Sequence, residues 1–273
     1  MTTLTGPAAT GTATYDDETR PGFAQVLGAE WVKLRTVRST WWTMAALFAL
    51  GAGLTILMCW GNADWLASAD ADESPGSFIT WGMMLAPICA VVLAALAVTT
   101  EYGTGMIRSS FAAVPSRGKV VAAKAVLVAG VLFVVGTVTA LVGYAGGNYF
   151  LDREGIGMAL GGDVLRAMYG SGLYLAGIGL FTIAVGFILR HTAGTVSVVL
   201  ALMLVLGNMV MLVPGSLGDW LENLMPGNAG GSIATPVSFN PNLLAPWTGF
   251  GVFALEVGVL LALAFVVVRR RDA

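Results

Sequence analysis

Charged side chains are scarce in this sequence. They make up 11% of its 273 residues, whereas hydrophobic residues make up 56%. A soluble domain carries about 25% charged residues, which cover the surface that faces water. The composition therefore excludes a soluble globular protein and indicates a protein with several membrane spans.

Residues and motifs that support catalysis are also missing. His191 is the only histidine, so there is no histidine pair for zinc, and neither G-x-S-x-G nor the phosphate loop G-x-x-x-x-G-K-[ST] occurs. We therefore expect no enzymatic activity in this chain, and no metal or cofactor bound to it. We expect a structural role for His191, and Cys59 and Cys89, which lie in apolar runs, to be packing thiols.

The first 22 residues have no positively charged start and no apolar core, which excludes a signal peptide. They are rich in Thr, Gly, Ala and acidic residues, which cannot form a packed core. The sequence predicts a disordered tail over 1–22.

Six apolar stretches are long enough to cross a bilayer, which takes about 20 residues. They must be helices, because in hydrocarbon every backbone amide has to be paired within its own segment. We predict an all-α membrane protein, with a kink at Pro87 in the second span because proline removes a backbone donor. The predicted spans are 42–60, 78–100, 120–145, 168–189, 193–213 and 247–268.

Positive charge gathers on one side of these spans. That side holds Lys33, Arg35, Arg38, Arg108, Arg117, Lys119, Lys124, Arg190 and Arg269–Arg271, whereas the other side holds Arg153 and Arg166 among many acidic residues. The positive-inside rule predicts that both termini are cytoplasmic in a multi-pass protein of the plasma membrane. Lys119 and Lys124 are expected to anchor the third span at the lipid headgroups.

Two segments look helical without spanning the membrane. Over 23–40, apolar residues including Trp31 recur at helical spacing while Lys33 and Arg35 take other faces, which predicts an amphipathic helix at the membrane interface. Glu30 and Lys33 are three residues apart and can pair. The outer loop 214–246 predicts one or two short helices, which either dip into the outer leaflet as a lid or pack on the bundle.

The stretch EYGTGMIRSS interrupts the apolar sequence directly after the second span. Gly103 and Gly105 allow a turn at low steric cost, and Met106, Ile107 and Phe111 then fit a short amphipathic helix within 101–116. The residues alone leave two interpretations open: a rigid handle for a soluble partner, or a plain connecting loop.

EWVKLRTVRSTWW, EYGTGMIRSSFAAVPSRGKVVAAK, LMPGNAGGSI and the closing RRRDA together resemble the ABC-2-type permeases of ATP-binding-cassette transporters, especially those of actinobacteria. The resemblance implies six membrane helices after an interfacial helix, a bacterial plasma membrane location, and a second permease chain as partner. It also implies a separate ATPase subunit, which would bind ATP and Mg²⁺, and no nucleic acid.

On that resemblance, the segment after the second span is the coupling helix that rests on the ATPase. The family signature around this helix then includes Glu101, Tyr102, Gly105 and Arg108, and the signature of the interfacial helix includes Glu30 and Lys33. The expected function is a permease subunit, most simply an exporter of an amphipathic substrate.

Two alternatives rest on other features. Glu256 lies within the sixth span, where an ionisable group is costly and by default suggests a function, so an ion-coupled secondary carrier is one alternative. Carriers usually show several such charges and repeated broken helices, which are not evident here. A purely structural membrane subunit is the other alternative.

Overall fold

The computed structural model describes residues 21–114, 116–210, 212–238, 240 and 242–270, and every regular element in these ranges is helical. Five of the helices are long and apolar enough to cross a membrane: Arg38–Leu66, Ala86–Gly103, Arg117–Arg153, Gly162–Leu189 and Pro246–Arg270. The predicted all-α membrane protein is therefore confirmed. The predicted tail lies almost entirely outside the described residues.

The elements follow one another along the chain without domain insertions. They are α1 (Phe23–Thr36), α2 (Arg38–Phe48), the π-helix η2 (Ala49–Gly53), α3 (Leu54–Leu66), α4 (Pro75–Phe78), the 3₁₀ helix η3 (Trp81–Met84), α5 (Ala86–Gly103), α6 (Met106–Ala113), α7 (Arg117–Arg153), α8 (Gly162–Leu189), α9 (Thr192–Leu200), the π-helix η4 (Ala201–Leu206), α10 (Gly207–Val210), α11 (Ser216–Leu224), α12 (Pro226–Gly231), the 3₁₀ helix η5 (Ser232–Ala234) and α13 (Pro246–Arg270).

Two of the predicted spans differ from the helices observed. The second long helix, α5, begins at Ala86, and Pro87 lies in its first turn, so the predicted kink at Pro87 is wrong. Proline fits there because amides of the first turn have no partner within the helix. The predicted span 193–213 corresponds to the shorter apolar helix Thr192–Leu206 and its continuation α10, so the count of six spans stays a prediction.

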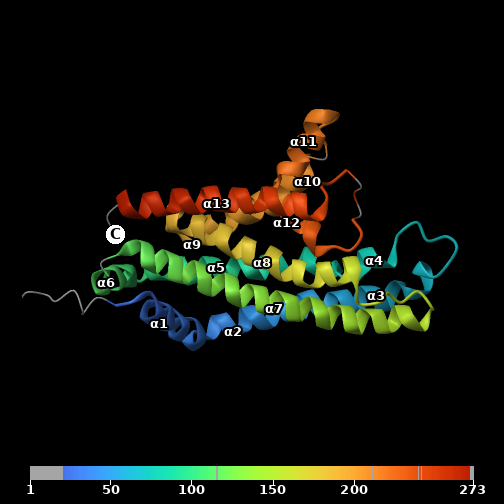
Figure 1. Ribbon diagram of the computed structural model, residues 1–273, viewed down its shortest axis with the longest axis horizontal. Helices are drawn as coiled ribbons and strands as arrows, with labels where there is room; N and C mark the ends of the chain where they lie inside the picture. Colours follow the sequence, from blue (N-terminus) through green and yellow to red (C-terminus); the bar gives the residue numbers. More distant parts are fainter. Residues whose placement is uncertain (1–20, 115, 211, 239, 241, 271–273) are drawn as a thin grey trace, which may run out of the picture.

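The long helices run side by side along the longest axis of the molecule, with α8 at the centre (Figure 1). In the most apolar stretch of α8, 72% of the residues are buried, against 22% for α13. Helices α7, α13, α5 and α9 surround α8. Helices α1 and α6 lie at one end of the bundle, where α13 also ends, and the loops that follow α3 and α7 lie at the other end.

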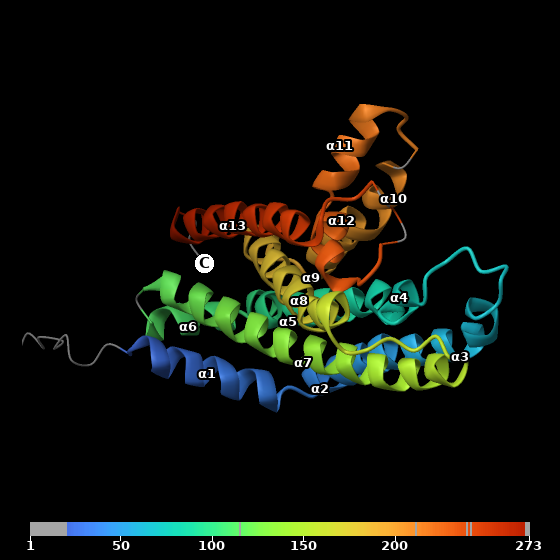
Figure 2. The same ribbon diagram turned by 45° about the vertical axis from the view of Figure 1, so that its right-hand side comes forward.

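The outer segment between α10 and α13 divides into two parts. Helix α12 and η5 pack on α8 and α13, whereas α11 stands away from the bundle in both views (Figures 1 and 2). The buried Arg166 of α8 holds the packed part by donating to the backbone carbonyls of Ser232, Ile233, Thr235 and Pro236 at 3.2–3.5 Å. Residues 226–236 are thus packed on the bundle rather than projecting as a lid.

The first long helix and the segment before α5 approach each other at their backbones. Gly82 of η3 lies against Gly51 of η2, and a Cβ added at Gly82 would overlap with the Gly51 carbonyl group. The Thr55 hydroxyl bridges the two, since it donates to Gly51 O at 2.8 Å and accepts from Gly82 N at 2.9 Å. This contact requires glycine, because no side chain fits between the two backbones.

We expect Gly82→Ala to destabilise the protein by about 1–3 kcal/mol, because the added methyl group must push two backbones apart. Gly61→Ala is the matched control, since nothing lies within 4 Å of a Cβ at Gly61. Thermal unfolding in detergent measures both. Equal midpoints for the two variants would show that the contact tolerates a side chain.

Candidate coupling site

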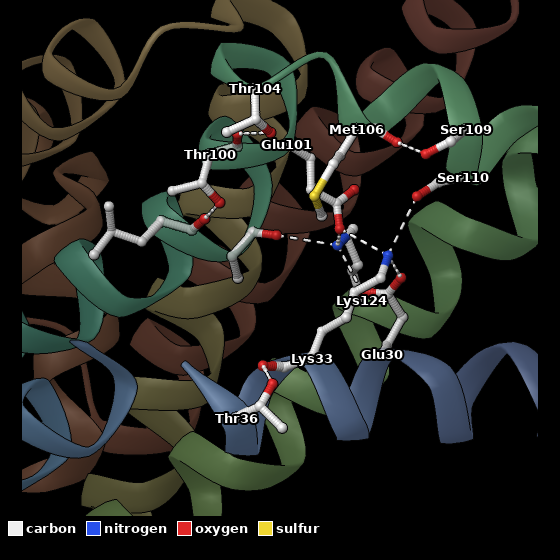
Figure 3. Close-up of polar contacts among 12 residues, drawn as sticks. Glu30, Lys33, Thr36, Thr100, Glu101, Thr104, Met106, Ser109, Ser110 and Lys124 are labelled. Carbon is white, nitrogen blue, oxygen red and sulfur yellow. Dashed lines mark hydrogen bonds and ion pairs between the residues drawn. The ribbon is translucent and has the colours of Figure 1, made fainter. Parts of the chain in front are cut away.

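Four charged side chains from three helices meet at the end of the bundle that carries α6 (Figure 3). Lys33 Nζ of α1 lies 2.8 Å from Glu30 Oε1 and 2.9 Å from Glu101 Oε1. Lys124 Nζ of α7 lies 2.6 Å from Glu30 Oε2 and 2.7 Å from Glu101 Oε1. We call these four residues the charge cluster; it ties α1, α5 and α7 together.

Three of the four members of the charge cluster are buried, and its carboxyl and amino groups are equal in number. Glu30, Glu101 and Lys124 are 5%, 4% and 3% exposed, and two carboxylates face two ammonium groups. Taking a charge out of water costs several kcal/mol unless a partner of opposite sign and hydrogen bonds replace the water. Each buried member therefore depends on its partners of opposite sign for the contacts that replace water.

Lys33 is the most accessible member, with a side chain that is 35% exposed. Burial lowers its pKa, but the hydrogen bonds and charges of Glu30 and Glu101 outweigh burial and raise that pKa above the ordinary value. Lys33 therefore remains a cation at neutral pH, and its contribution to stability would be lost only as the pH rises through this raised pKa.

Helix α6 is attached directly to the charge cluster. Ser110 Oγ of α6 accepts a hydrogen bond from Lys33 Nζ at 3.2 Å. Ile107 is 3% exposed, and the Arg117 guanidinium lies over the Phe111 ring at 5.6 Å. One face of α6 is thus fixed to the bundle by polar and apolar contacts.

A left-handed residue starts α6. Gly105 has φ +72° and precedes Met106, the first helical residue. A side chain in this conformation is strained, whereas glycine adopts it at no cost. The turn predicted at Gly105 is present, and it reverses the chain directly after α5.

The structure brings together three of the predicted site residues and separates the others. Glu30, Lys33 and Glu101 form the charge cluster, and the predicted pair of Glu30 and Lys33 is present. Arg108 is exposed on α6, and Arg35 is exposed on α1. Glu101 is therefore buried within the chain, whereas Arg108 and Arg35 are both exposed to solvent.

Tyr102 and Glu256 belong to other surroundings. The Tyr102 ring packs edge-to-face on Phe187, with centroids 6.3 Å apart, and the Arg190 guanidinium lies 5.1 Å from its centroid. Glu256 lies on α13, half-buried, and its Oε2 has no hydrogen-bond partner among the described residues. Neither residue contributes to the charge cluster.

Lys124 is the functional residue that the sequence interpretation misplaced. Its predicted position at the lipid headgroups is wrong, because its ammonium group is buried and also donates to Ala97 O at 3.1 Å. Its sequence neighbours, in VVAAKAVLV, are all apolar, which signals a buried lysine. The carboxylates that balance it lie 23 and 94 residues away, and only the fold brings them near.

His191 has the structural role that its position in a short turn predicts. Its Nδ1 accepts a hydrogen bond from Gly194 N at 3.1 Å and so caps the start of α9. Among the residues that the structure describes, no three His, Cys, Asp or Glu side chains are grouped so that they could hold a metal ion.

A family comparison bears directly on this site. A sequence model of the ABC-2 family transporter proteins matches residues 26–208, which is about two thirds of the chain. The chain belongs to the ABC-2 transporter family. The matched range contains α5, α6, α7 and the whole charge cluster, and the ABC-2-type permease expected from the sequence is confirmed. No curated protein matches the chain.

As a member of this family, the chain is a permease subunit, the membrane-spanning part of an ATP-binding-cassette transporter. Such subunits work in association with an ATPase and a membrane. In this permease, the helix implied by the resemblance to contact the ATPase is α6, which the charge cluster holds against the bundle.

We expect Lys124→Met to destabilise the permease by about 3–5 kcal/mol, because two buried carboxylates would lose the buried one of the two ammonium groups that they share. Lys119→Met is the matched control: Lys119 is exposed and lies five residues earlier on the same helix. The measurement is thermal unfolding in detergent, followed by size-exclusion chromatography. If both variants unfold like the wild type, the cluster does not hold the three helices together.

Proposed function

We propose that this permease is driven by a separate ATPase that docks on α6, and that it exports an amphipathic substrate. The observation that carries the proposal is the attachment of α6 to the charge cluster through Ser110 and Lys33. This attachment makes α6 a rigid element rather than a flexible connection.

The connections of α6 suit the transmission of force. Only Thr104 and Gly105 separate α5 from α6, and residues 114–116 separate α6 from α7. A displacement of α6 therefore acts on two membrane helices at once. Through Lys33 it also acts on α1, so three helices would tilt together when the ATPase moves.

The exposed side chains of α6 offer contacts for a partner. Met106 is 48% exposed, and Arg108 and Ser109 are exposed beside it. A methionine adapts to different apolar surfaces, and an arginine pairs well with carboxylates. The chain has no phosphate loop, so ATP and Mg²⁺ would be bound by the partner.

The charges at the two ends support a cytoplasmic position for α6. Lys33, Arg35, Arg38, Arg108, Arg269 and Arg270 belong to the α6 end of the bundle, and the loop after α3 carries Asp70, Asp72 and Glu73. By the positive-inside rule both termini face the cytoplasm of a bacterial cell. The working unit would contain two permease chains and two ATPase chains.

We expect Arg108→Glu to weaken capture of the ATPase subunit about tenfold or more, because a charge-assisted hydrogen bond becomes a repulsion. Arg153→Glu, which changes an exposed arginine at the opposite end, is the matched control. The measurement is co-purification after co-expression with a candidate ATPase subunit that the wild-type permease captures, paired with the ATP hydrolysis rate of the complex.

Substitutions at Gly105 test the same docking of the ATPase on α6 without changing the charge of the helix. Gly105→Val should impair capture, because the left-handed turn would be strained, whereas Gly105→Asn should retain it, because asparagine tolerates this conformation. If the ATPase binds and hydrolyses ATP equally with all of these variants, α6 is only a connection, and the structural-subunit alternative gains.

Glu256 keeps one alternative function open, because its Oε2 has no described hydrogen-bond partner inside an apolar helix. If the permease is ATPase-driven, Glu256→Gln should leave ATP hydrolysis by the complex unchanged, because the amide keeps the shape of the side chain. A carrier would instead move protons in liposomes containing the permease chain alone, and Glu256→Gln would abolish that flux. An internal pH dye measures it, and wild-type flux without the ATPase would favour the carrier.

A further inference from the structure

Two cavities adjoin where α1 and α2 lie against α7, beside the charge cluster. The first, of about 230 Å³, lies between α1, α2, α5 and α7, and the second, of about 560 Å³, is a groove along α7. Leu34, Thr40 and Leu127 line both of them. The two cavities therefore adjoin at these three side chains, and we treat them as two compartments.

The first compartment has a polar wall. It is lined by the hydroxyl-bearing residues Thr36, Ser39, Thr40, Thr43 and Thr100, and by Glu101 and Lys33 of the charge cluster. Glu101 Oε1 accepts from both lysines, whereas its Oε2 is buried and accepts from no residue that the structure describes. A buried carboxylate oxygen without a donor is costly, so this compartment favours a ligand that donates hydrogen bonds.

The second compartment is apolar. Trp31, Trp41, Met44 and valines of α7 line it, and the exposed Arg35 stands among its lining residues. Gly130 of α7 contributes no side chain to the groove, and nothing lies within 4 Å of a Cβ placed there. An acyl chain fits these surroundings, and the guanidinium of Arg35 suits a phosphate.

We propose that the two compartments bind one glycerophospholipid with a primary ammonium headgroup, of the phosphatidylethanolamine type. The ammonium group lies in the first compartment and donates to threonine hydroxyls and, once the Glu101 side chain has rotated toward the ligand, to Glu101 Oε2, which is closed to solvent without a ligand. One acyl chain occupies the groove along α7, and the phosphate lies between them toward Arg35. The lipid thereby supplies the donor that the charge cluster leaves missing.

The chemistry of the first compartment selects among headgroups. A primary ammonium has three N–H donors, whereas the trimethylated ammonium of phosphatidylcholine has none. An apolar groove alone would bind both lipids equally well. A preference for the lipid with N–H donors therefore indicates a specific site for the headgroup.

The experiment is native mass spectrometry of the detergent-solubilised permease chain with phosphatidylethanolamine, its N-methyl derivatives and phosphatidylcholine, all with the same acyl chains. The wild type should retain one phosphatidylethanolamine with about tenfold preference over phosphatidylcholine. Retention should fall stepwise as methyl groups replace N–H donors. Equal retention across the series would overturn the proposal.

Two variants separate the compartments. Gly130→Leu should lower retention of both lipids about tenfold, because leucine fills the groove; Gly258→Leu is the matched control, since it lies on α13 with equally open space. Glu101→Gln should reduce the preference for phosphatidylethanolamine over phosphatidylcholine, and thermal unfolding of the same variant shows whether the helices that form the groove remain packed. If Gly130→Leu retains lipid like Gly258→Leu, the groove is not the site. The experiment uses the permease chain without an ATPase, so its outcome does not depend on whether an ATPase docks on α6.

Discussion

Charge buried at the end of an apolar bundle has to be balanced inside the bundle, and this constraint organises the α6 end of the permease. Lys124 is 3% exposed on a helix whose neighbouring residues are apolar, so water cannot stabilise its ammonium group. Glu30 and Glu101 supply the balance from two other helices. Helices α1, α5 and α7 are consequently held in one relative arrangement, because separating them would leave a buried charge without a partner.

This arrangement explains why α6 has a defined position although it contains only eight residues. A helix of this length is not stable alone in water, since most of its backbone groups lie at its ends. Ser110 joins it to Lys33, Ile107 is buried beneath it, and the Phe111 ring lies under the guanidinium of Arg117. The packing of the rest of the chain thus determines the structure of α6 and leaves its outer face free for a partner.

The two ends of the bundle are fastened by different chemistry. At the α6 end, ions of opposite sign alternate between three helices, whereas at the other end a single guanidinium, that of Arg166, binds four backbone carbonyls of the outer segment and the carboxylate of Asp163 at 3.1 Å. Carbonyl groups carry no net charge, so the Arg166 contacts can be exchanged for water at lower cost. The α6 end is therefore held mainly by pairs of opposite charge, and the other end mainly by one charge on carbonyl oxygens.

The sequence by itself determined the class of the protein. Its low charge content and long apolar stretches predict membrane helices, because hydrocarbon demands paired backbone groups, and its spread motifs led to the ABC-2 family. It also indicated the turn at Gly105 and the pair of Glu30 and Lys33, since both depend on residues close together in the chain. Local spacing is sufficient for such features.

Only the tertiary structure decided which distant groups meet. The partners of Lys124 lie 23 and 94 residues away, so no spacing rule could identify them, and its apolar surroundings were compatible with a position at the membrane surface. The start of α5 at Ala86 depends on the packing of η3 against η2, which places Pro87 in a first turn rather than within a span. Pairings of this kind follow from the packing of whole helices, which a linear sequence does not display.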